Sequence, residues 1–404
     1  MMTSALLTRR WSSGGRGIND VGYGSISQRR KEDHHHCVTL VQKRDYEGYL
    51  CGLLLPSAAA RESYFAIRAL NVEIASIKDT SSRLVAGRSR RVEGSSNMAA
   101  SGAIPSRFAG DNNTFIHDQD GNSMVSGGGG GGTSSSLAQK LRMQWWKNSI
   151  SEIYDTTNNN ILSVEAAIDN DLSSSLVARR NPTLRSVANA IQTHQLTHRF
   201  IRRLIEAREL DLDINQYTTL SNVAQYGEDT MSNILYLTLE CVNVRDEKAD
   251  LVASDIGVAL GILTTLRSTR YRILQNECSI PMDVATRYGI TMDTLHTAIT
   301  AVVEEDEDDM SMKNTTNNDK VIFSQEGLRN AVVEMADMAL FHLHRARAHQ
   351  SHVQKGGRMA LLPAVCGLHY LNSLKECNYN VVHPSYLGGG IMMLRWKELR
   401  GNDD

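Results

Sequence analysis

The sequence is poor in proline, has no closely spaced cysteine pair and carries no surplus of positive charge. Only six of the 404 residues are proline, which leaves room for long uninterrupted helices. The six cysteines include no Cys-x-x-Cys pair, which excludes a zinc-ribbon spacing, and we expect mostly reduced, buried thiols. The 43 Lys and Arg residues are balanced by 45 Asp and Glu residues, so the net charge of −2 argues against a general nucleic-acid-binding protein.

Long apolar runs and phosphate-binding loops are missing as well. The mean hydropathy is −0.31, and no apolar run reaches the roughly 18 residues of a membrane span, which excludes spanning helices as the main architecture. No strand-and-helix alternation occurs, and the glycine tract at 127–132 lacks the lysine and the helix start of a phosphate loop. These absences argue against a nucleotide-binding α/β fold.

What the sequence does contain is helical periodicity. Apolar residues recur at steps of three and four over 328–343 and over 200–205, as one face of a helix requires. The stretch 251–267 carries Gly257 and Gly261 among its Leu and Ile residues, and such small residues predict a helix that packs closely on its neighbours or lines a cavity. The pattern predicts an all-α protein.

The N-terminal residues 1–36 have the composition of a mitochondrial transit peptide. Six Arg and Lys residues and a single acid, Asp20, precede Glu32, and Ser and Gly fill much of the rest. We expect a disordered transit peptide here, and the alternative is a disordered basic tail.

Two low-complexity segments interrupt the remaining chain. Residues 82–136 are rich in Gly, Ser, Arg and Asn and predict a mobile loop, because they offer little apolar surface to bury. Residues 304–319 open with six consecutive acids, which is typical of a solvated linker and lacks the spaced ligands of a calcium loop. Without these segments roughly 290 residues remain, a size that suits one large helical domain.

Several stretches resemble signature blocks of the squalene/phytoene synthase family. Residues 64–71 (Tyr-Phe-Ala-Ile-Arg-Ala-Leu-Asn) resemble the first signature helix of that family, and 255–267 resemble its second. Residues 141–154 are similar to its helix rich in Leu, Trp and Tyr, and 279–283 to the turn after the second helix. The resemblance covers 45–396 and implies a single all-α domain of the isoprenoid synthase type with a central cavity.

Active members of this family couple prenyl diphosphates using magnesium ions, which two facing helices hold through Asp-x-x-x-Asp motifs. The first motif falls on Asn71 and Ala75 of this sequence, and the second falls on Ser268 and Arg272. All four carboxylates are missing. The resemblance therefore implies a protein with no catalytic residue, no metal and no cofactor.

The alternative is a prenyl transferase that uses relocated acids. Glu73 lies about 200° round the helix from Asn71, and Asp79 lies roughly 12 Å along it. Asp246 and Asp250 form an Asp-x-x-x-Asp pattern, but they precede the second signature helix within a charged stretch. We expect these acids to lie on solvated faces.

Within the family, residues 45–51, 68–73 and 142–147 resemble the branch of mitochondrial complex I assembly factors. That resemblance implies a mitochondrial protein, attached peripherally to the matrix side of the inner membrane. Its partners would be complex I subunits or other assembly factors, with no nucleic acid. An apolar cavity without magnesium would hold a lipid.

Six further positions are candidates for lining the cavity or contacting a ligand: Tyr64, Arg68, Trp146, Gly257, Gly261 and Arg267. Arg68 and Arg267 precede the lost aspartates, and in active members such arginines help to arrange the diphosphate. The alternative is that each pairs with a buried acid such as Asp255 or Glu73, because buried charges are normally paired.

Four histidines crowd one predicted helix, at His342, His344, His349 and His352. Their spacing would place two imidazoles on one metal ion. No carboxylate or cysteine follows at ligand spacing. We therefore expect a basic C-terminal end of the helix, where positive charge interacts favourably with the helix dipole.

Overall fold

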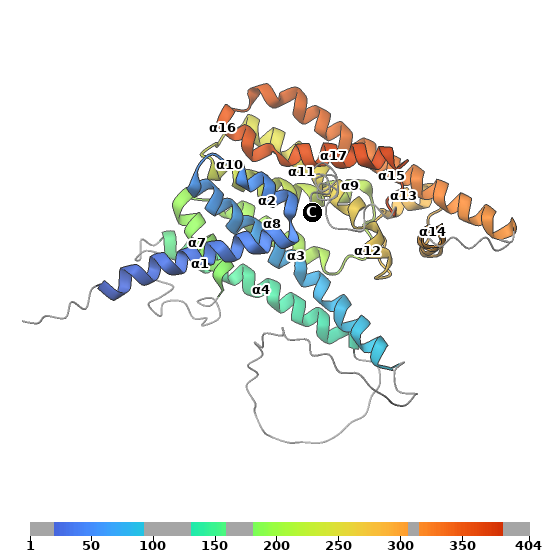
Figure 1. Cartoon of the computed structure of the whole chain (residues 1–404), viewed down its shortest axis with the longest axis horizontal. Coiled ribbons are helices and arrows are strands. Elements are labelled where there is room, and N and C mark those ends of the chain that lie inside the picture. Colours follow the sequence, from blue (N-terminus) through green and yellow to red (C-terminus); the bar gives the residue numbers. More distant parts are fainter. Residues whose placement is uncertain (1–19, 93–130, 159–180, 306–314, 383–404) are drawn as a thin grey trace, which may run out of the picture.

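The fold is built from α-helices throughout the part of the chain that the structure describes (Figure 1). The computed structural model describes residues 20–92, 131–158, 181–305 and 315–382, and these ranges contain no β-strand. The helices are α1 (Asp20–Arg44), α2 (Tyr46–Leu53), α3 (Ala58–Val92), α4 (Gly131–Asn158), α7 (Pro182–His194), α8 (His198–Asp211), α9 (Leu220–Gly227), η1 (Glu228–Ser232), α10 (Asn233–Cys241), α11 (Glu247–Arg267), α12 (Thr269–Ile273), α13 (Met282–Arg287), α14 (Met292–Glu305), α15 (Thr315–His349), η2 (Gln350–His352), α16 (Lys355–Arg358), η3 (Met359–Leu361) and α17 (Pro363–Glu376). The all-α prediction is confirmed.

Short polar side chains begin several of these helices. The carboxylate of Asp45 accepts a hydrogen bond from the Gly48 amide at the start of α2 (3.1 Å), and Asn181 accepts one from the Leu184 amide in α7 (2.8 Å). Such N-caps satisfy amides that have no partner within the helix. Pro182 follows Asn181 at the first position of α7, where its missing N–H costs no helical hydrogen bond.

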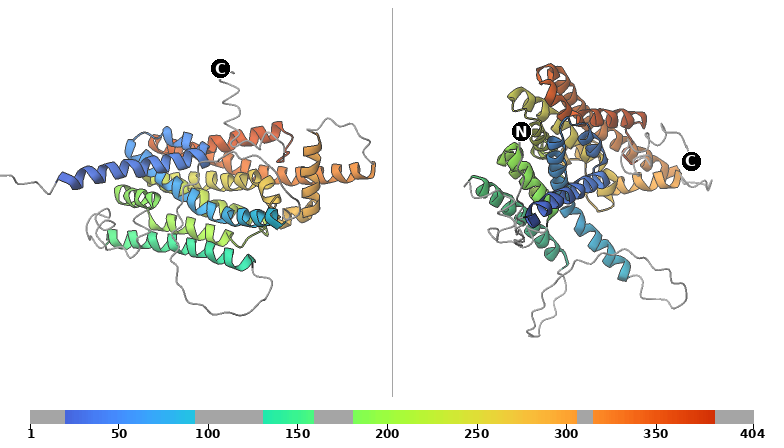
Figure 2. Two further views of the ribbon diagram at one scale, coloured as in Figure 1. Left: turned by 60° about the horizontal axis from the view of Figure 1, so that its bottom comes forward. Right: turned by 60° about the vertical axis from the view of Figure 1, so that its left-hand side comes forward.

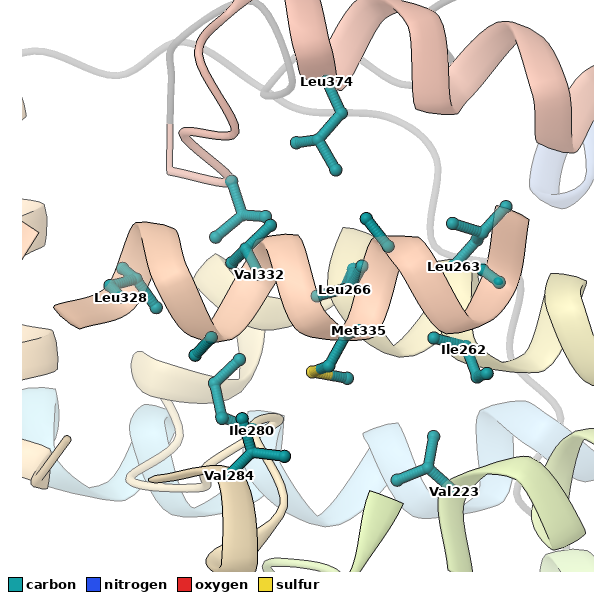
Figure 3. Close-up of a cluster of buried hydrophobic side chains, with 14 of the residues drawn as sticks. Val223, Ile262, Leu263, Leu266, Ile280, Val284, Leu328, Val332, Met335 and Leu374 are labelled. Carbon is teal, nitrogen blue, oxygen red and sulfur yellow. The ribbon is translucent and has the colours of Figure 1, made fainter. Parts of the chain in front are cut away.

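Helix α11 is the centre of the larger hydrophobic core. It packs against α9, η1, α15 and α17, and Figure 3 shows Leu266 close to Met335 of α15. The face predicted over 328–343 is the buried face of α15, which confirms that periodicity. Among the described helices, α11 alone has the length and hydropathy of a membrane span, and 72% of that apolar window is buried inside the protein.

A second core forms where α3 packs against α4, α7, α8 and α10. Ile67, Leu70 and Ile74 form a stripe along α3, and all three are fully buried. In the left view of Figure 2, α4 lies along one side of the molecule and α17 along the other, with α3 and α11 between them. The two signature helices therefore lie in the interior.

Helix α1 begins inside the N-terminal segment 1–36 that the sequence predicts to be disordered. It packs against α3 and α7, its Cys37 is fully buried, and Nε of Arg185 donates to the Asp33 carboxylate (2.8 Å). The expectation of disorder over 1–36 is therefore wrong from Asp20 onward, because a few contacts fix a helix whose composition is mostly polar. Residues 1–19 lie outside the described part of the chain.

The two low-complexity segments also begin and end in helix. Helix α3 continues to Val92 and α4 begins at Gly131, so both run into the segment 82–136. Helix α15 begins at Thr315, inside the segment 304–319. The loop expectation is wrong for these turns, since an established helix adds further residues at little cost. Residues 93–130 and 306–314 lie outside the described ranges.

The small residues of α11 allow a close approach between helices. A Cβ atom added to Gly257 would overlap the backbone of Ser232 in η1, and one added to Gly261 would overlap Gly227 at the end of α9. A Cβ on Gly227 would lie 3.0 Å from the Val258 carbonyl oxygen. Of the two predictions for this stretch, close helix packing is confirmed. Gly257 and Gly261 face another helix, and their placement as cavity-lining residues is wrong.

Candidate functional site

Arg68 of α3 is held by helix α2. Its Nε atom lies 2.7 Å from Oδ2 of Asp45, and its guanidinium lies 5.8 Å from the centre of the Tyr64 ring. Tyr64 is buried and donates a hydrogen bond from its hydroxyl to the Gly48 carbonyl (2.7 Å). Burial is the largest single influence on the Arg68 pKa and lowers it, but the Asp45 carboxylate, Tyr64 and Cys51 together raise the pKa above its ordinary value. Any side chain at Gly48 would overlap this guanidinium, so the glycine is required there.

Arg267, the last residue of α11, also reaches α2. Its Nη1 atom donates to Oε2 of Glu47 (2.8 Å), and its guanidinium lies 5.6 Å from the centre of the Tyr370 ring in α17. Both signature arginines are thus neutralised by acids at the start of one short helix. The expectation that each pairs with an acid is correct, but Asp255 and Glu73 were the wrong partners.

The first former metal position holds a hydrogen bond between an amide and a guanidinium. Oδ1 of the buried Asn71 accepts from Nη2 of Arg208 (3.0 Å). The other terminal nitrogen of Arg208 donates to the hydroxyl of Tyr226 (2.6 Å). Ala75, one turn further along α3, adds only a methyl group to this face. A cationic side chain from α8 therefore faces the position where active members of the family have a carboxylate.

The second former metal position lies beyond a break in the helix. Helix α11 ends at Arg267, Ser268 follows as its C-cap, and α12 begins at Thr269. The Ser268 hydroxyl donates to the Thr265 carbonyl (2.8 Å), so it is bonded to its own helix. Ser268 and Arg272 thus belong to the cap and to the next short helix rather than to one continuous helix face.

Charged pairs join α3 to α12 at this position. Nη2 of Arg272 lies 3.9 Å from Oδ2 of Asp211 at the end of α8, and its Nη1 lies 3.4 Å from Oε2 of Glu277. Nζ of Lys78 in α3 lies 3.3 Å from the same Asp211 oxygen and 3.8 Å from the same Glu277 oxygen. Two cations and two acids of the protein thus link the helices that active members link through metal ions. We call Lys78, Asp211, Arg272 and Glu277 the ion-pair cluster.

The charged groups of the ion-pair cluster are largely shielded from water, so protein groups must compensate their charges. Burial lowers the pKa of Lys78 even though Asp211 lies beside it, and the ammonium also donates to the carbonyls of Asp211 and Ile214 (both 2.7 Å). The second Asp211 oxygen accepts from the hydroxyl of Tyr217 (2.7 Å), whose pKa burial raises. Both oxygens of the buried Asp211 carboxylate are therefore occupied by protein groups.

The relocated acids do not converge. Glu73 accepts a hydrogen bond from a threonine of α7, and Asp79 is exposed. Asp246 caps the start of α11, and Asp250 lies about 27 Å along the helix from Ser268, given 1.5 Å per residue. Among the described residues, no group of three or more His, Cys, Asp and Glu side chains could hold a metal ion. The geometry does not favour the alternative of a relocated metal site.

The histidines predicted to share one helix lie in α15 and, for His352, in η2, and they divide into two separate environments. Nδ1 of His342 lies 2.9 Å from Oδ1 of Asp255 in α11, and Nε of Arg345 donates to the same carboxylate (2.8 Å). Burial would raise the pKa of Asp255, but these hydrogen bonds outweigh it and hold the pKa below its usual value. His349 and His352 stack on each other instead, with ring centres 5.8 Å apart. His342 thus belongs to a contact between α11 and α15.

Of the six candidate contact positions, only Tyr64, Arg68 and Arg267 are brought together, around α2. Trp146 is 4% exposed and packs in the second core, with the Trp145 ring edge-on at 4.8 Å.

The sequence reasoning missed Lys78 and Asp211. Lys78 follows Asn71 by seven residues, which is two turns along the same helix face, so its approach to the former metal position could have been found. Asp211 carries no such signal, because it lies 133 residues from Lys78 in the sequence and only the fold brings the two together.

The chain is similar to known proteins over most of its length. The profile of the family described as squalene/phytoene synthase matches residues 41–396. A human protein named NADH dehydrogenase (ubiquinone) complex I, assembly factor 6 is 28% identical over 351 residues, covering 87% of this chain and 76% of the human one. A Drosophila melanogaster protein named as a homolog of that factor is 27% identical over 367 residues, covering 90% and 83%.

Solved structures share the fold at much lower identity. Squalene synthase HpnC from Alicyclobacillus acidocaldarius aligns with a TM-score of 0.52 at 14% identity, covering 88% of this chain and 98% of that one. A dehydrosqualene synthase aligns with a TM-score of 0.50 at 13% identity, covering 87% and 89%. These likenesses show an all-α fold of the isoprenoid synthase type.

Proposed function

The chain belongs to the squalene/phytoene synthase family, and from that premise we propose that it is a non-catalytic assembly factor for respiratory complex I. The proposal that the protein is non-catalytic rests on the ion-pair cluster. Where family chemistry needs two rows of free carboxylates, this chain has Asn71, Ala75, Ser268 and Arg272, and the nearby acids are bonded to Lys78 and Arg272. The complex I part is supported by the names of the human and Drosophila relatives, which match nearly the whole chain.

The proposal extends to location. We propose a mitochondrial protein on the matrix side of the inner membrane, attached peripherally, with a targeting peptide in the basic N-terminal segment. Asp33 is buried and bonded to Arg185, and Cys37 is fully buried. Any processing cut would therefore precede Asp33, since a cut after it would remove a residue that anchors α1.

The proposal also extends to partners. Complex I subunits or other assembly factors are the proposed partners, and a lipid is the class of ligand that a metal-free cavity of this fold would hold. With its former metal positions filled by protein groups, the helical body would serve as a scaffold for protein contacts.

The test compares assembled complex I in cells with and without the protein. Loss of the chain should lower the amount of complex I on native gels while the other respiratory complexes persist, and the wild-type chain should restore it. Glu73→Gln and Asp250→Asn should restore it equally well, because neither acid takes part in catalysis. Failure of both folded variants to rescue would favour an enzyme with relocated acids. Unchanged complex I in the deleted cells would contradict the assembly role itself.

A further inference from the structure

Two cysteines from distant parts of the sequence meet where α2 packs against α17. Sγ of Cys51 lies 3.9 Å from Sγ of Cys366, although 315 residues separate them in the chain. Both thiols are free. Cys51 is only 6% exposed, whereas Cys366 is partly exposed, so the pair is sheltered yet open to small solutes from the Cys366 side.

The surroundings of the pair favour a thiolate at Cys51. The hydrogen bond that Cys51 shares with Cys366 lowers the pKa of Cys51, burial opposes that shift, and the Arg68 guanidinium adds to it. The same hydrogen bond, followed by burial, raises the pKa of Cys366, which therefore keeps its proton. A thiolate beside a protonated thiol is the arrangement in which one sulfur is oxidised and the other resolves it.

We propose that Cys51 and Cys366 form a reversible oxidation site whose oxidant is a peroxide. The Cys51 thiolate attacks one oxygen of hydrogen peroxide and the O–O bond breaks, which leaves a sulfenic acid and a hydroxide ion that takes up a proton to form water. The Cys366 sulfur then attacks the sulfenic sulfur. The S–O bond breaks, an S–S bond forms, and the Cys366 proton leaves with the hydroxyl group as a second water. The two sulfurs together give up two electrons, which the peroxide accepts.

Only a small movement of the two sulfur atoms is needed to form the disulfide bond. A disulfide bond is about 2.05 Å long, so the two sulfur atoms must approach by about 2 Å. Helix α2 has only eight residues and already packs on α17, so side-chain rotation with a slight shift of this helix can bring the sulfurs together.

The cross-link would act on the segment that neutralises the signature arginines. Helix α2 presents Asp45 to Arg68 and Glu47 to Arg267. A disulfide would fix this helix to α17, and it would close a very long loop, which restricts the unfolded chain. Oxidation is therefore expected to raise the melting temperature and to hold the arginines in their present pairs.

The test treats the full-length protein with one equivalent of hydrogen peroxide and then blocks free thiols by alkylation. Digestion without reduction and mass spectrometry should find one cross-linked peptide pair, Cys51 with Cys366, lighter by two hydrogen atoms. The melting temperature should rise by several degrees and return to its starting value with dithiothreitol.

Two variants sharpen the result. Cys377→Ser removes the other partly exposed cysteine and should leave the cross-link intact. Cys366→Ser, checked for folding by circular dichroism, should abolish the cross-link and leave a Cys51 sulfenic acid that dimedone traps. Cross-links spread among several cysteines, or a Cys51 thiol that stays reduced while Cys377 is oxidised, would overturn the proposal.

Discussion

Replacement of Asp211 by Asn removes the more buried of the two carboxylates that Lys78 and Arg272 share. Asp211 is 5% exposed, and its oxygens also accept the hydrogen bond from Tyr217. The substitution leaves two largely buried cations facing Glu277 alone, and breaking a buried ion pair costs about 3–5 kcal/mol. Because the side chains of Lys78 and Arg272 keep 17% and 15% exposure, we expect the lower end of that range, about 3 kcal/mol.

Urea and thermal unfolding of the full-length protein measure this loss. At about 2–4 °C per kcal/mol, the melting temperature should fall by roughly 6–12 °C. The matched control is Asp213→Asn, which breaks an ion pair with Lys140 whose side chains are 58% and 46% exposed, and it should cost less than about 1 kcal/mol. Adding Lys78→Met to Asp211→Asn should recover part of the loss, because one unpaired charge is removed. Equal effects of Asp211→Asn and Asp213→Asn, or a second loss on adding Lys78→Met, would refute the reasoning.

Three further predictions concern the helix contact, acid stability and the former metal positions. Gly257→Ala places a methyl group against the backbone of η1 and should lower the free energy of unfolding by about 1–3 kcal/mol. The control Gly356→Ala, whose added methyl group would have no atom within 4 Å, should change it by less than about 0.5 kcal/mol. Equal urea midpoints for the two variants would contradict the close contact. The folded pKa of Asp255 lies below its unfolded value of 3.8, so its contribution to stability is present above that value and is lost as pH falls through the folded pKa. Asp255→Asn should therefore be less stable than wild type at pH 6, with a gap that narrows below about pH 4, and a gap of constant size in urea unfolding would count against this. Asn71→Asp combined with Ala75→Asp should give no product from prenyl diphosphates and magnesium, because an arginine still occupies the second position; chromatographic detection of a coupled product would show otherwise.

The helices could be predicted because their signals are local. The apolar period over 328–343 and the small residues Gly257 and Gly261 each report on neighbours along the same helix, and the structure places both in helix contacts. The N-terminal error has the opposite cause. Composition shows that residues 20–36 are polar, but it does not show that Asp33 meets Arg185, which lies 152 residues away.

The candidate site also has features that the sequence predicts locally and features that depend on distant contacts. Register with the family motifs predicts the former metal positions, and Asn71 and Ala75 do lie one turn apart on one helix. What occupies the space between the two helices depends on tertiary contacts, and Asp211 comes from a third helix. The acids that pair with Arg68 and Arg267 could not be identified from the sequence for a related reason. A buried arginine predicts an acidic partner but does not show which acid it is.

The central claim is that protein ion pairs have replaced the metal site. The most direct measurement is calorimetric titration of magnesium and a prenyl diphosphate into the full-length protein, with and without a chelator, beside an active squalene synthase as the control. We predict binding heat that depends on the chelator for the control and none for this protein. Tight binding to this protein that the chelator abolishes would contradict the claim and would mean that a carboxylate metal site is retained.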